Sequence, residues 1–313
     1  MLGINRIAVC GTGFIGKGLV RQLISQGYVI NVLDHNVCPD EFSGKTKWVT
    51  GEFADNDSLK NILDGSEVAY HLISSTVPGD DTVDPIKELS ENIFSTIAFL
   101  EMCKKCNVKR IVFVSSSSVY GLQSTMPISE GAETNPISSH GIQKLTIEKY
   151  LLLYQFLYGI DIRIIRLSNP YGPGQSLCGR QGFVAIAIGH LIKNEPVLLR
   201  DSGRPIRDFI YIDDVIEAFI AVINNLDNFE KSFYNFEIGS NELYTIREFT
   251  ELVKRLCKNN NTFLNFGSLP YREGEVMKSH ADTKLLRSLG WKPKVSLEKG
   301  LKLTIEKEQG KKH

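Results

Sequence analysis

The chain has 313 residues, enough for about two domains of ~150 residues each. Hydrophobic residues make up 42% and charged residues 23% of the sequence, a composition that excludes a disordered, collagen-like or coiled-coil protein. Because 36 basic residues balance 36 acidic ones, no net charge attracts nucleic acid or an anionic membrane. Any anionic ligand must therefore be held by a local site.

Hydropathy and cysteine spacing exclude further classes of protein. No apolar run reaches the ~20 residues that span a bilayer, and the first residues lead into a short strand without a signal-peptide core. We therefore expect a cytoplasmic protein. The six cysteines are scattered, and the close pair Cys103 and Cys106 lies in a helical stretch without a second pair. This spacing predicts neither a metal site nor a disulfide framework.

The first half of the chain alternates short apolar strands with amphipathic helices. Strands are predicted at 6–10, 29–34, 67–73, 110–116 and 161–167, and helices at 16–26, 57–63, 84–106 and 138–158. Continuous Val, Ile and Leu runs indicate strands buried on both faces, as in a parallel sheet covered by helices. The pattern predicts an α/β protein with a Rossmann-type doubly wound parallel sheet.

The regular alternation of strands and helices ends after Arg166, where the sequence becomes rich in Gly and Pro and the predicted elements become shorter. We expect residues 1–170 to form the Rossmann domain and residues 171–313 to form a smaller C-terminal part. Segments near 205–235 are expected to return to the main sheet.

A glycine-rich turn lies between the first strand and the first helix. Gly11, Gly13 and Gly16 form a GxGxxG, which lets the backbone approach a pyrophosphate at the positive end of a helix. A tight strand-to-helix turn alone would give the same pattern. Asp34 ends the second strand, where a carboxylate would bind the adenosine ribose and repel a 2′-phosphate. The pair favours NAD over NADP, although Asp34 could also cap the LDHN turn.

Many further stretches match one family in order along nearly the whole chain. They are CGTGFIG, VLDHN, GEFADNDSLKNIL, VAYHLIS, SSSSVYG, SSHGIQK, RLSNPYGPGQ, RDFIYIDD, REGE and LGWKPKVSLEKGL. With these, the sequence resembles the extended short-chain dehydrogenase/reductase family. Within it, the chain is similar to the NAD-dependent nucleotide-sugar epimerase/dehydratase group and its UDP-glucose 4-epimerases. The resemblance implies a Rossmann domain and a C-terminal part that binds the nucleotide sugar.

Three positions depart from the family pattern. Cys10 stands where the family usually has a glycine, and Arg200 where relatives commonly have an aromatic residue near the nucleotide base. The family's YxxxK is present as His140-Gly141-Ile142-Gln143-Lys144, so that a histidine replaces the catalytic tyrosine.

The resemblance implies the cofactor-binding residues. Gly11, Gly13, Phe14, Ile15 and Gly16 would lie at the pyrophosphate, Asp34 at the adenosine ribose, Glu52 and Phe53 at adenine, Leu72 and Ile73 at the nicotinamide, and Asn92 and Lys144 nearby. Ordinary packing would equally explain Phe53, Leu72 and Ile73, and a cap would explain Asn92.

The resemblance also implies the catalytic residues Ser116, His140 and Lys144. Ser116 would exchange hydrogen bonds with a sugar oxygen as a carbonyl forms. His140 and Lys144 are four residues apart on a helix and share a face, and an imidazole accepts a proton at neutral pH. Ser117 and Ser118 stand where the family's dehydratases carry an acid and a base, which disfavours dehydration.

The substrate-binding residues implied by the resemblance lie in the second half. Asn169, Arg207 and Arg272 would bind the nucleotide diphosphate, for which forked guanidinium groups are suited. Glu275 would hold the nucleotide ribose, and Ser279 would leave room around C2 of the sugar. Surface salt bridges with Asp208 or Glu275 are the alternative role for the arginines.

The resemblance implies an NAD-dependent epimerase of polysaccharide biosynthesis that inverts C4 of a UDP-hexose or UDP-N-acetylhexosamine through a 4-keto sugar. A nucleotide-sugar dehydrogenase or reductase is one alternative, and a catalytically impaired nucleotide-sugar binding protein is another because of His140. We also expect a homodimer through the helices at 84–106 and 138–158, which carry more apolar residues than one sheet-facing stripe requires. These are Ile93, Phe94, Ile97, Phe99, Leu100, Leu151, Leu152, Tyr154, Phe156 and Leu157.

Overall fold

The computed structural model describes residues 5–75, 84–178, 182–225, 233–258, 264–269 and 275–310. The chain divides into two compact units. Unit 1 comprises Met1–Val119, Ser138–Arg166 and Phe219–Phe236, and unit 2 comprises Tyr120–Ile137, Leu167–Ala218 and Glu237–His313. Where the sequence predicts one boundary near residue 170, the chain passes between the units several times.

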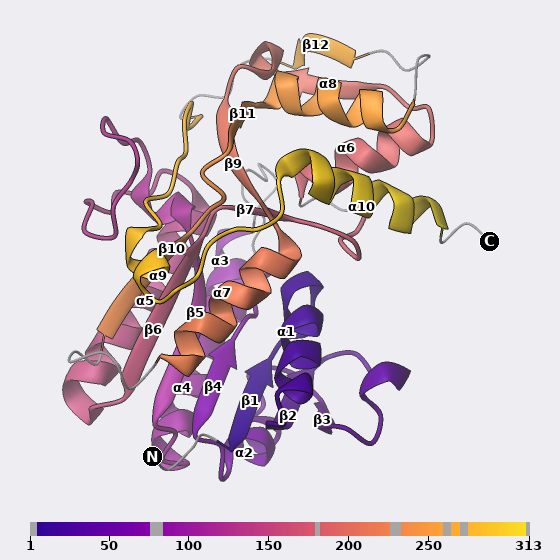
Figure 1. The fold of residues 1–313 in the computed structure, drawn as a ribbon. Coiled ribbons are helices and arrows are strands. Elements are labelled where there is room, and N and C mark those ends of the chain that lie inside the picture. Colours follow the sequence, from indigo (N-terminus) through magenta and orange to yellow (C-terminus); the bar gives the residue numbers. More distant parts are fainter. Residues whose placement is uncertain are drawn as a thin grey trace. The chain divides into compact units, whose positions relative to one another are not determined.

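The main sheet contains seven strands within the described residues, and Figure 1 shows them as a twisted layer flanked by helices. Their bounds are β1 Arg6–Cys10, β2 Val29–Asp34, β3 Lys47–Thr50, β4 Val68–His71, β5 Arg110–Ser116, β6 Asp161–Leu167 and β10 Phe233–Ile238. The order is β10-β6-β5-β4-β1-β2-β3. Strands β3, β2, β1, β4 and β5 pair in parallel. The predicted α/β class and doubly wound parallel sheet are confirmed.

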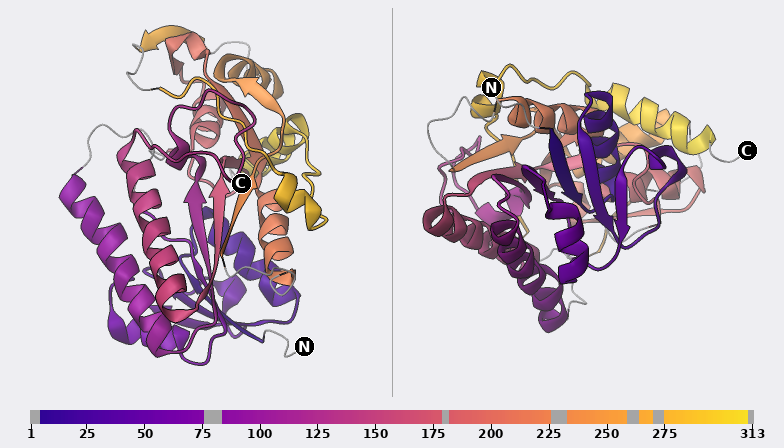
Figure 2. Two further views of the ribbon diagram at one scale, coloured as in Figure 1. Left: turned by 90° about the vertical axis from the view of Figure 1, so that its left-hand side faces the viewer. Right: turned by 90° about the horizontal axis from the view of Figure 1, so that it is seen from below.

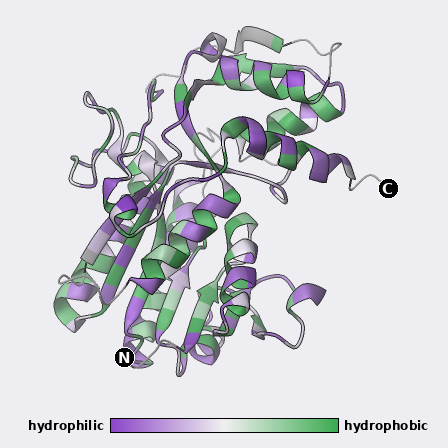
Figure 3. Ribbon diagram, viewed as in Figure 1, coloured by the Kyte–Doolittle hydropathy of each residue, from purple (hydrophilic) through white to green (hydrophobic). Residues whose placement is uncertain are grey.

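The helices of the main sheet are α1 Phe14–Ser25, α2 Asn56–Leu63, α3 Pro85–Leu89, α4 Ser95–Lys105, α5 Ser139–Tyr158 and α7 Ile212–Asn224. Side chains of α2, α4 and α5 share one core cluster with β1, β4, β5 and β6. On the opposite face, α1 contacts β1 and β2, and Phe219 of α7 stacks on Tyr70 of β4 with ring centroids 6.4 Å apart. Figure 3 shows hydrophobic residues along the strands between these two helical layers. Burial on both faces explains their uninterrupted apolar sequences.

Several elements differ from the sequence-based expectations. The helix predicted at 84–106 contains a π-helical turn, Ser90–Phe94, between α3 and α4, and α1 begins at Phe14 rather than residue 16. Strand β4 is shorter than the predicted 67–73. Strand β3 was not predicted, because it lies at the sheet edge with its residues at most half-buried and therefore lacks a continuous apolar run.

Unit 2 is built from shorter elements. They are β7 Asn169–Tyr171, α6 Phe183–Ile192, β8 Val197–Arg200, β9 Ile206–Tyr211, β11 Leu243–Thr245, α8 Ile246–Leu256, β12 Leu264–Leu269, α9 Lys284–Ser288 and α10 Leu297–Gly310. The short 3-10 turn Asp201–Gly203 also belongs to unit 2, whereas Asp40–Phe42 lies in unit 1 and Ser117–Tyr120 lies where the chain passes from unit 1 to unit 2. Strands β11, β9 and β7 form one small sheet, and β12 pairs with β8. Of the segments near 205–235, β10 joins the main sheet, whereas β9 pairs with β7 and β11. In the described ranges, no helix is long and apolar enough to cross a bilayer.

Candidate active site

The glycine-rich turn has the geometry of an anion cradle. A Cβ on Gly16 would lie 2.1 Å from the Gly11 carbonyl oxygen, so only glycine fits where α1 crosses the turn. A Cβ on Gly13 would meet nothing within 4 Å, so the space above that residue is open. Helix α1 begins after Gly13 with no side-chain cap and no acidic residue in its first turn. Its N–H groups and dipole are therefore directed at this space and suit a phosphate.

Asp34 closes the turn from the neighbouring strand. Its Oδ2 accepts from the backbone N and Oγ1 of Thr12, both at 2.6 Å, and its Oδ1 accepts from the backbone N of Asn36 at 2.8 Å and from Asn36 Nδ2 at 2.9 Å. Burial alone would raise the pKa of Asp34, but these hydrogen bonds outweigh it and lower the pKa. The carboxylate thus caps the LDHN turn, as the alternative role predicted, and ribose binding stays a prediction.

The predicted adenine and nicotinamide residues lie in different surroundings. The Phe53 ring packs in the core, with its centroid 4.7 Å from that of His71, so ordinary packing accounts for it. Leu72 and Ile73 lie against the glycine turn, since a Cβ on Gly16 would lie 3.3 Å from the Leu72 side chain and a Cβ on Gly11 would lie 2.9 Å from the Ile73 side chain. Glu52 is exposed. Contacts of these residues with a cofactor stay predictions.

Asn92 is buried in the π-helical turn and makes several hydrogen bonds. Its Oδ1 accepts from the backbone N of Ser75 at 3.0 Å, and its Nδ2 donates to Gln143 Oε1 at 2.9 Å. Gln143 Nε2 in turn donates to Glu88 at 2.6 Å. Asn92 therefore ties the segment after β4 to the first turns of α5. A contact of Asn92 with a cofactor stays a prediction.

The sheet brings the predicted reacting residues to the edge that carries the glycine turn. Strands β1, β4 and β5 are parallel neighbours, so their carboxyl ends meet at one edge, where α/β sheets bind ligands. With about 4.8 Å between strands, the end of β5 lies roughly 10 Å from the end of β1. Ser116 ends β5 and is half-buried, and its Oγ accepts from the backbone N of Ser118 at 3.2 Å and from Ser118 Oγ at 3.0 Å.

Helix α5 supplies the other two reacting residues. Ser138 caps its N-terminus by accepting from Gly141 N at 3.1 Å, and His140 and Lys144 are both buried. Lys144 Nζ donates to the Val114 carbonyl at 2.8 Å, which brings the ammonium to the end of β5. Burial lowers the pKa of Lys144 to about 8. Lys144 is thus placed at Ser116's end of the strand, with His140 one helical turn earlier on the same face of α5.

The described substrate-side residues gather around β9 in unit 2. Arg207 Nη2 donates to Glu275 Oε1 at 2.5 Å, and Arg207 Nη1 donates to the Val276 carbonyl. Asn169 Nδ2 donates to the Asp208 carbonyl at 3.0 Å, and Ser279 N donates to the Ile206 carbonyl at 3.2 Å. The Arg207–Glu275 salt bridge is one that the alternative role predicted. Binding of a diphosphate stays a prediction, and Arg272 lies outside the described residues.

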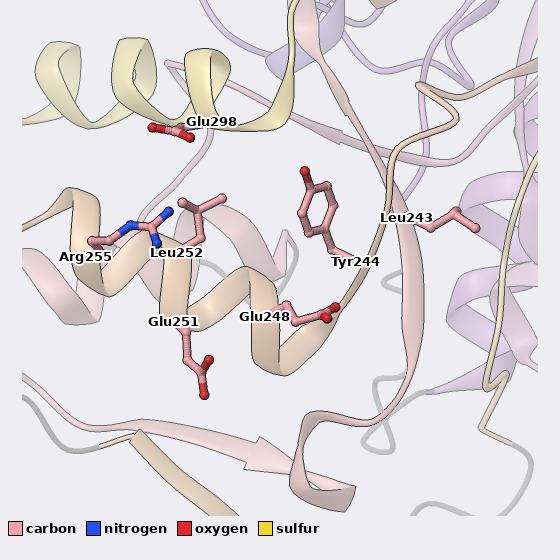
Figure 4. A pocket seen from close by; sticks show the side chains of 7 residues that line it. All are labelled: Leu243, Tyr244, Glu248, Glu251, Leu252, Arg255 and Glu298. Carbon is pink, nitrogen blue, oxygen red and sulfur yellow. The ribbon is translucent and has the colours of Figure 1, made fainter.

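A separate hollow of about 380 Å³ lies in unit 2 against β11, α8 and α10 (Figure 4). Its lining residues are Leu243, Tyr244, Glu248, Glu251, Leu252, Arg255 and Glu298. None of these seven is a predicted site residue. Glu248 also belongs to the capping box of α8 with Thr245, so a structural role already accounts for it.

Sequence reasoning missed buried residues that form hydrogen bonds to predicted site residues or to their neighbours. Thr12 binds the Asp34 carboxylate, and Glu148 is buried on α5 between Ser115 and Arg166. One signal was present, because Glu148 follows Lys144 by four residues and therefore shares its helical face. A second was Arg166, a charged residue near the end of the buried strand DIRIIRL.

Known proteins resemble the chain over nearly its whole length. A Methanocaldococcus jannaschii protein with a provisional UDP-glucose 4-epimerase name is 32% identical over 303 residues, 94% of this chain and 95% of its own length. The Thermotoga maritima UDP-glucose 4-epimerase, solved with UDP-glucose, has a TM-score of 0.87 at 31% identity, covering 98% of this chain and 100% of that chain. The Thermus thermophilus UDP-glucose 4-epimerase, solved with NAD, has a TM-score of 0.86 at 25% identity and covers 97% and 99%.

Other relatives are named for different reactions on nucleotide sugars. They include a dTDP-4-dehydro-6-deoxyglucose reductase of Escherichia coli and a UDP-glucuronic acid decarboxylase of Arabidopsis thaliana. The open glycine turn at the uncapped start of α1 fits the pyrophosphate of a dinucleotide. Residues 7–239 match the NAD dependent epimerase/dehydratase family. The chain belongs to this family, as its sequence predicted, and its cofactor is NAD.

Proposed function

We propose that the protein is a nucleotide-sugar 4-epimerase that acts on a UDP-hexose or a UDP-N-acetylhexosamine. The observation that carries the proposal is the contact of Lys144 of α5 with the end of β5, where Ser116 stands, with His140 one helical turn before Lys144. The parallel sheet brings this end to the edge that carries the glycine turn. The UDP-sugar epimerases among the relatives support the choice of substrate.

The chain's own residues would bind the reactants and move one proton. NAD, when bound, supplies reversible hydride acceptance. The turn at Gly11–Gly16 would hold its pyrophosphate and Lys144 its nicotinamide ribose. His140 would take the proton of the C4 hydroxyl as the 4-keto sugar forms, and would return it once the sugar has turned. Ser116 would donate to the carbonyl oxygen and later accept from the new hydroxyl.

The substrate would be held by unit 2. The protein has no net charge, so the negative diphosphate of the substrate needs local positive charge. Arg207 and Arg272 would supply it, because a guanidinium group is permanently charged. Asn169 would add an amide donor, Glu275 would accept from the nucleotide ribose, and Ser279 would leave room at C2. Because Arg207 is already paired with Glu275, substrate binding requires the guanidinium to share or exchange this partner.

Two other functions have specific support. A nucleotide-sugar reductase or dehydrogenase is favoured by relatives that carry such names. A nucleotide-sugar binding protein is favoured by His140, because an imidazole is shorter than the phenol of the family's tyrosine and reaches a sugar hydroxyl less well. The first function would change the amount of NADH with each turnover, and the second would leave both the sugar and NADH unchanged.

One assay separates the three functions. The protein is incubated with UDP-glucose or UDP-N-acetylglucosamine, the product epimer is followed by proton NMR, and NADH is followed by its absorbance. Appearance of the C4 epimer without net NADH formation supports the proposal. Stoichiometric NADH formation supports a dehydrogenase, and binding without turnover of any UDP-sugar supports a binding protein.

We also propose a cytoplasmic homodimer through α4 and α5, which lie side by side in Figure 2. Of the apolar residues singled out in the sequence, Phe99 and Leu151 are buried within unit 1, whereas Phe94, Phe156 and Leu157 are exposed by 65%, 81% and 52%. Exposed aromatic side chains on paired helices are typical of an interface. We expect Phe156→Asp to convert a dimer to a monomer in sedimentation experiments. A wild-type monomer at micromolar concentration would contradict the proposal.

A further inference from the structure

A buried carboxylate on α5 has no part in the proton transfer described above. Glu148 is 2% exposed and lies one helical turn after Lys144. Its Oε1 accepts from Ser115 Oγ at 2.5 Å and from Arg166 Nε at 3.1 Å, and its Oε2 accepts from Arg166 Nη2 at 2.6 Å. Such a forked, charge-assisted arrangement fixes the carboxylate in direction as well as in place.

The partners of Glu148 belong to two neighbouring strands. Ser115 lies on β5 and Arg166 on β6, which are adjacent in the main sheet. The last three residues of β5 are Val114, Ser115 and Ser116. The Val114 carbonyl accepts from Lys144, Ser115 donates to Glu148, and Ser116 is a predicted catalytic residue. Two side chains one turn apart therefore fasten the buried face of α5 to the last residues of β5.

We propose that Glu148 is a positioning residue of the candidate active site, which holds the Lys144 ammonium charged and in register with Ser116 and His140. The inference rests on the proposed function only for its kinetic consequence. Its structural content concerns Lys144 itself and can be measured in the protein without substrate.

The groups around Lys144 explain why a carboxylate is needed. From β4, burial and the Lys144 charge hold the pKa of His71 well below its usual range, so that this ring is neutral. From β5, the Phe113 ring lies 4.8 Å from Lys144 Nζ and offers only its face. From α5, Glu148 raises the pKa of Lys144 against the larger lowering effect of burial. His140 is one turn away on the same helix.

Arg166 belongs to the same arrangement but acts at longer range. It pairs with Glu148 from β6 and orients the carboxylate. Removing the Glu148 charge would take away the negative charge near Lys144 and would leave the positive charge of Arg166 in place. Both effects disfavour a charged Lys144. Removing both charges would take away the support for Lys144 without leaving a buried ion unpaired.

The titration of Lys144 tests the proposal directly. The holoprotein, with its bound NAD, is labelled with ¹³C at lysine Cε, the Lys144 signal is identified by its loss in Lys144→Met, and its chemical shift is followed with pH. The wild-type midpoint is expected near pH 8. We expect Glu148→Gln to lower it by about one pH unit or more. At pH 7 a one-unit shift lowers the charged fraction of Lys144 from about nine-tenths to about half, so the epimerase kcat should fall about twofold with little change in KM.

Matched variants separate positioning from mere stability. Glu101→Gln removes a carboxylate that accepts from Tyr154 near the other end of α5, so it should lower stability without moving the Lys144 midpoint. Glu148→Asp keeps the charge and should restore most of the midpoint.

If Glu148→Gln does not fold, a double variant still tests the proposal. Glu148→Gln combined with Arg166→Met removes both buried charges and should lower the Lys144 midpoint as well. A wild-type midpoint in either folded variant would overturn the proposal. An inactive wild type with the expected titration shifts would contradict the proposed function and leave the positioning role intact.

Discussion

In unit 1, Ser116 ends a seven-residue strand and Lys144 lies in the second turn of a helix of 20 residues. In unit 2, Arg207 lies on a six-residue strand and is already paired with Glu275. The first pair is held by backbone geometry and by buried contacts such as Lys144 with Val114. The second is held by a salt bridge between two side chains and by a hydrogen bond from Arg207 to the Val276 carbonyl.

The difference suggests a division of labour between the units. Groups that act on a reacting bond must be fixed before the substrate arrives, because their reorganisation would add to the barrier. Groups that bind a diphosphate can exchange one partner for another, since the phosphate replaces the lost carboxylate. Substitutions in unit 1 are therefore expected to change kcat, and substitutions in unit 2 to change KM.

The largest effect is expected at His140. His140→Phe should lower the epimerisation rate by about 100-fold or more, the contribution of a positioned general base. His140→Tyr should raise the wild-type rate by at least about tenfold, because a misplacement of ~1 Å costs ~100-fold and the phenol reaches farther. Both rates are measured by NMR with UDP-glucose.

Ser116→Ala provides the control for His140, since it should slow both the wild type and His140→Tyr. A fast wild type that His140→Tyr slows down would show that the histidine is an adapted base. If both proteins are inactive with every UDP-sugar, the binding-protein alternative gains support.

In unit 2, Arg207→Ala should raise KM for UDP-sugars by about 100-fold, as expected for the loss of a charge-assisted contact with phosphate. Its kcat and the affinity for NAD should change little. Glu275→Gln keeps Arg207 but removes its carboxylate partner, so it should raise KM less. A loss of kcat equal to the rise in KM would contradict the division of labour between the units.

Asp34 is predicted to have the next largest effect. Asp34→Ala should weaken NAD binding by about tenfold, through loss of a hydrogen-bonded carboxylate, and should relax discrimination against NADP. Because its folded pKa is lowered, Asp34 stabilises the fold at pH values above its unfolded pKa, and this stability is lost as pH falls through the folded pKa.

Two titrations test the roles of Asp34. Calorimetry with NAD and NADP measures the cofactor preference, and Thr12→Val, which loses the hydroxyl bound to Asp34, serves as a milder variant. Equal affinities of the wild type for NAD and NADP would show that the ribose role is wrong. The free energy of unfolding, measured at a series of acidic pH values, should depend less on pH for Asp34→Ala than for the wild type.

The sequence predicted regular elements better than their interruptions. Strands β1, β2, β5 and β6 were predicted with the observed bounds, because burial on both faces leaves a continuous apolar run. The π-helical turn at 90–94 was missed, since its extra residue is stabilised by contacts of Asn92 with Ser75 and Gln143, which are distant in sequence. Strand β3 was missed because an edge strand lacks such a run.

The candidate site divides in the same way. Motifs gave the positions of Gly11–Gly16, Ser116 and Lys144, which regular elements bring to one sheet edge. They did not give Glu148, whose importance depends on partners from two other strands. Nor did they show that Arg207 is paired with Glu275, because two side chains 68 residues apart in sequence meet only in the folded unit.

The smallest effect is expected at Ser279, and it concerns the choice of sugar. Ser279 is half-buried, and its backbone N donates to the Ile206 carbonyl beside Arg207. Ser279→Tyr should raise KM for UDP-N-acetylglucosamine by roughly fivefold to tenfold, the cost of about 1 kcal/mol for overfilling a site, and should affect UDP-glucose less. Ser279→Ala keeps the site small and should leave both values unchanged. Equal penalties on the two substrates would mean that Ser279 does not face the C2 group, and unit 2 would then hold the diphosphate without selecting the sugar.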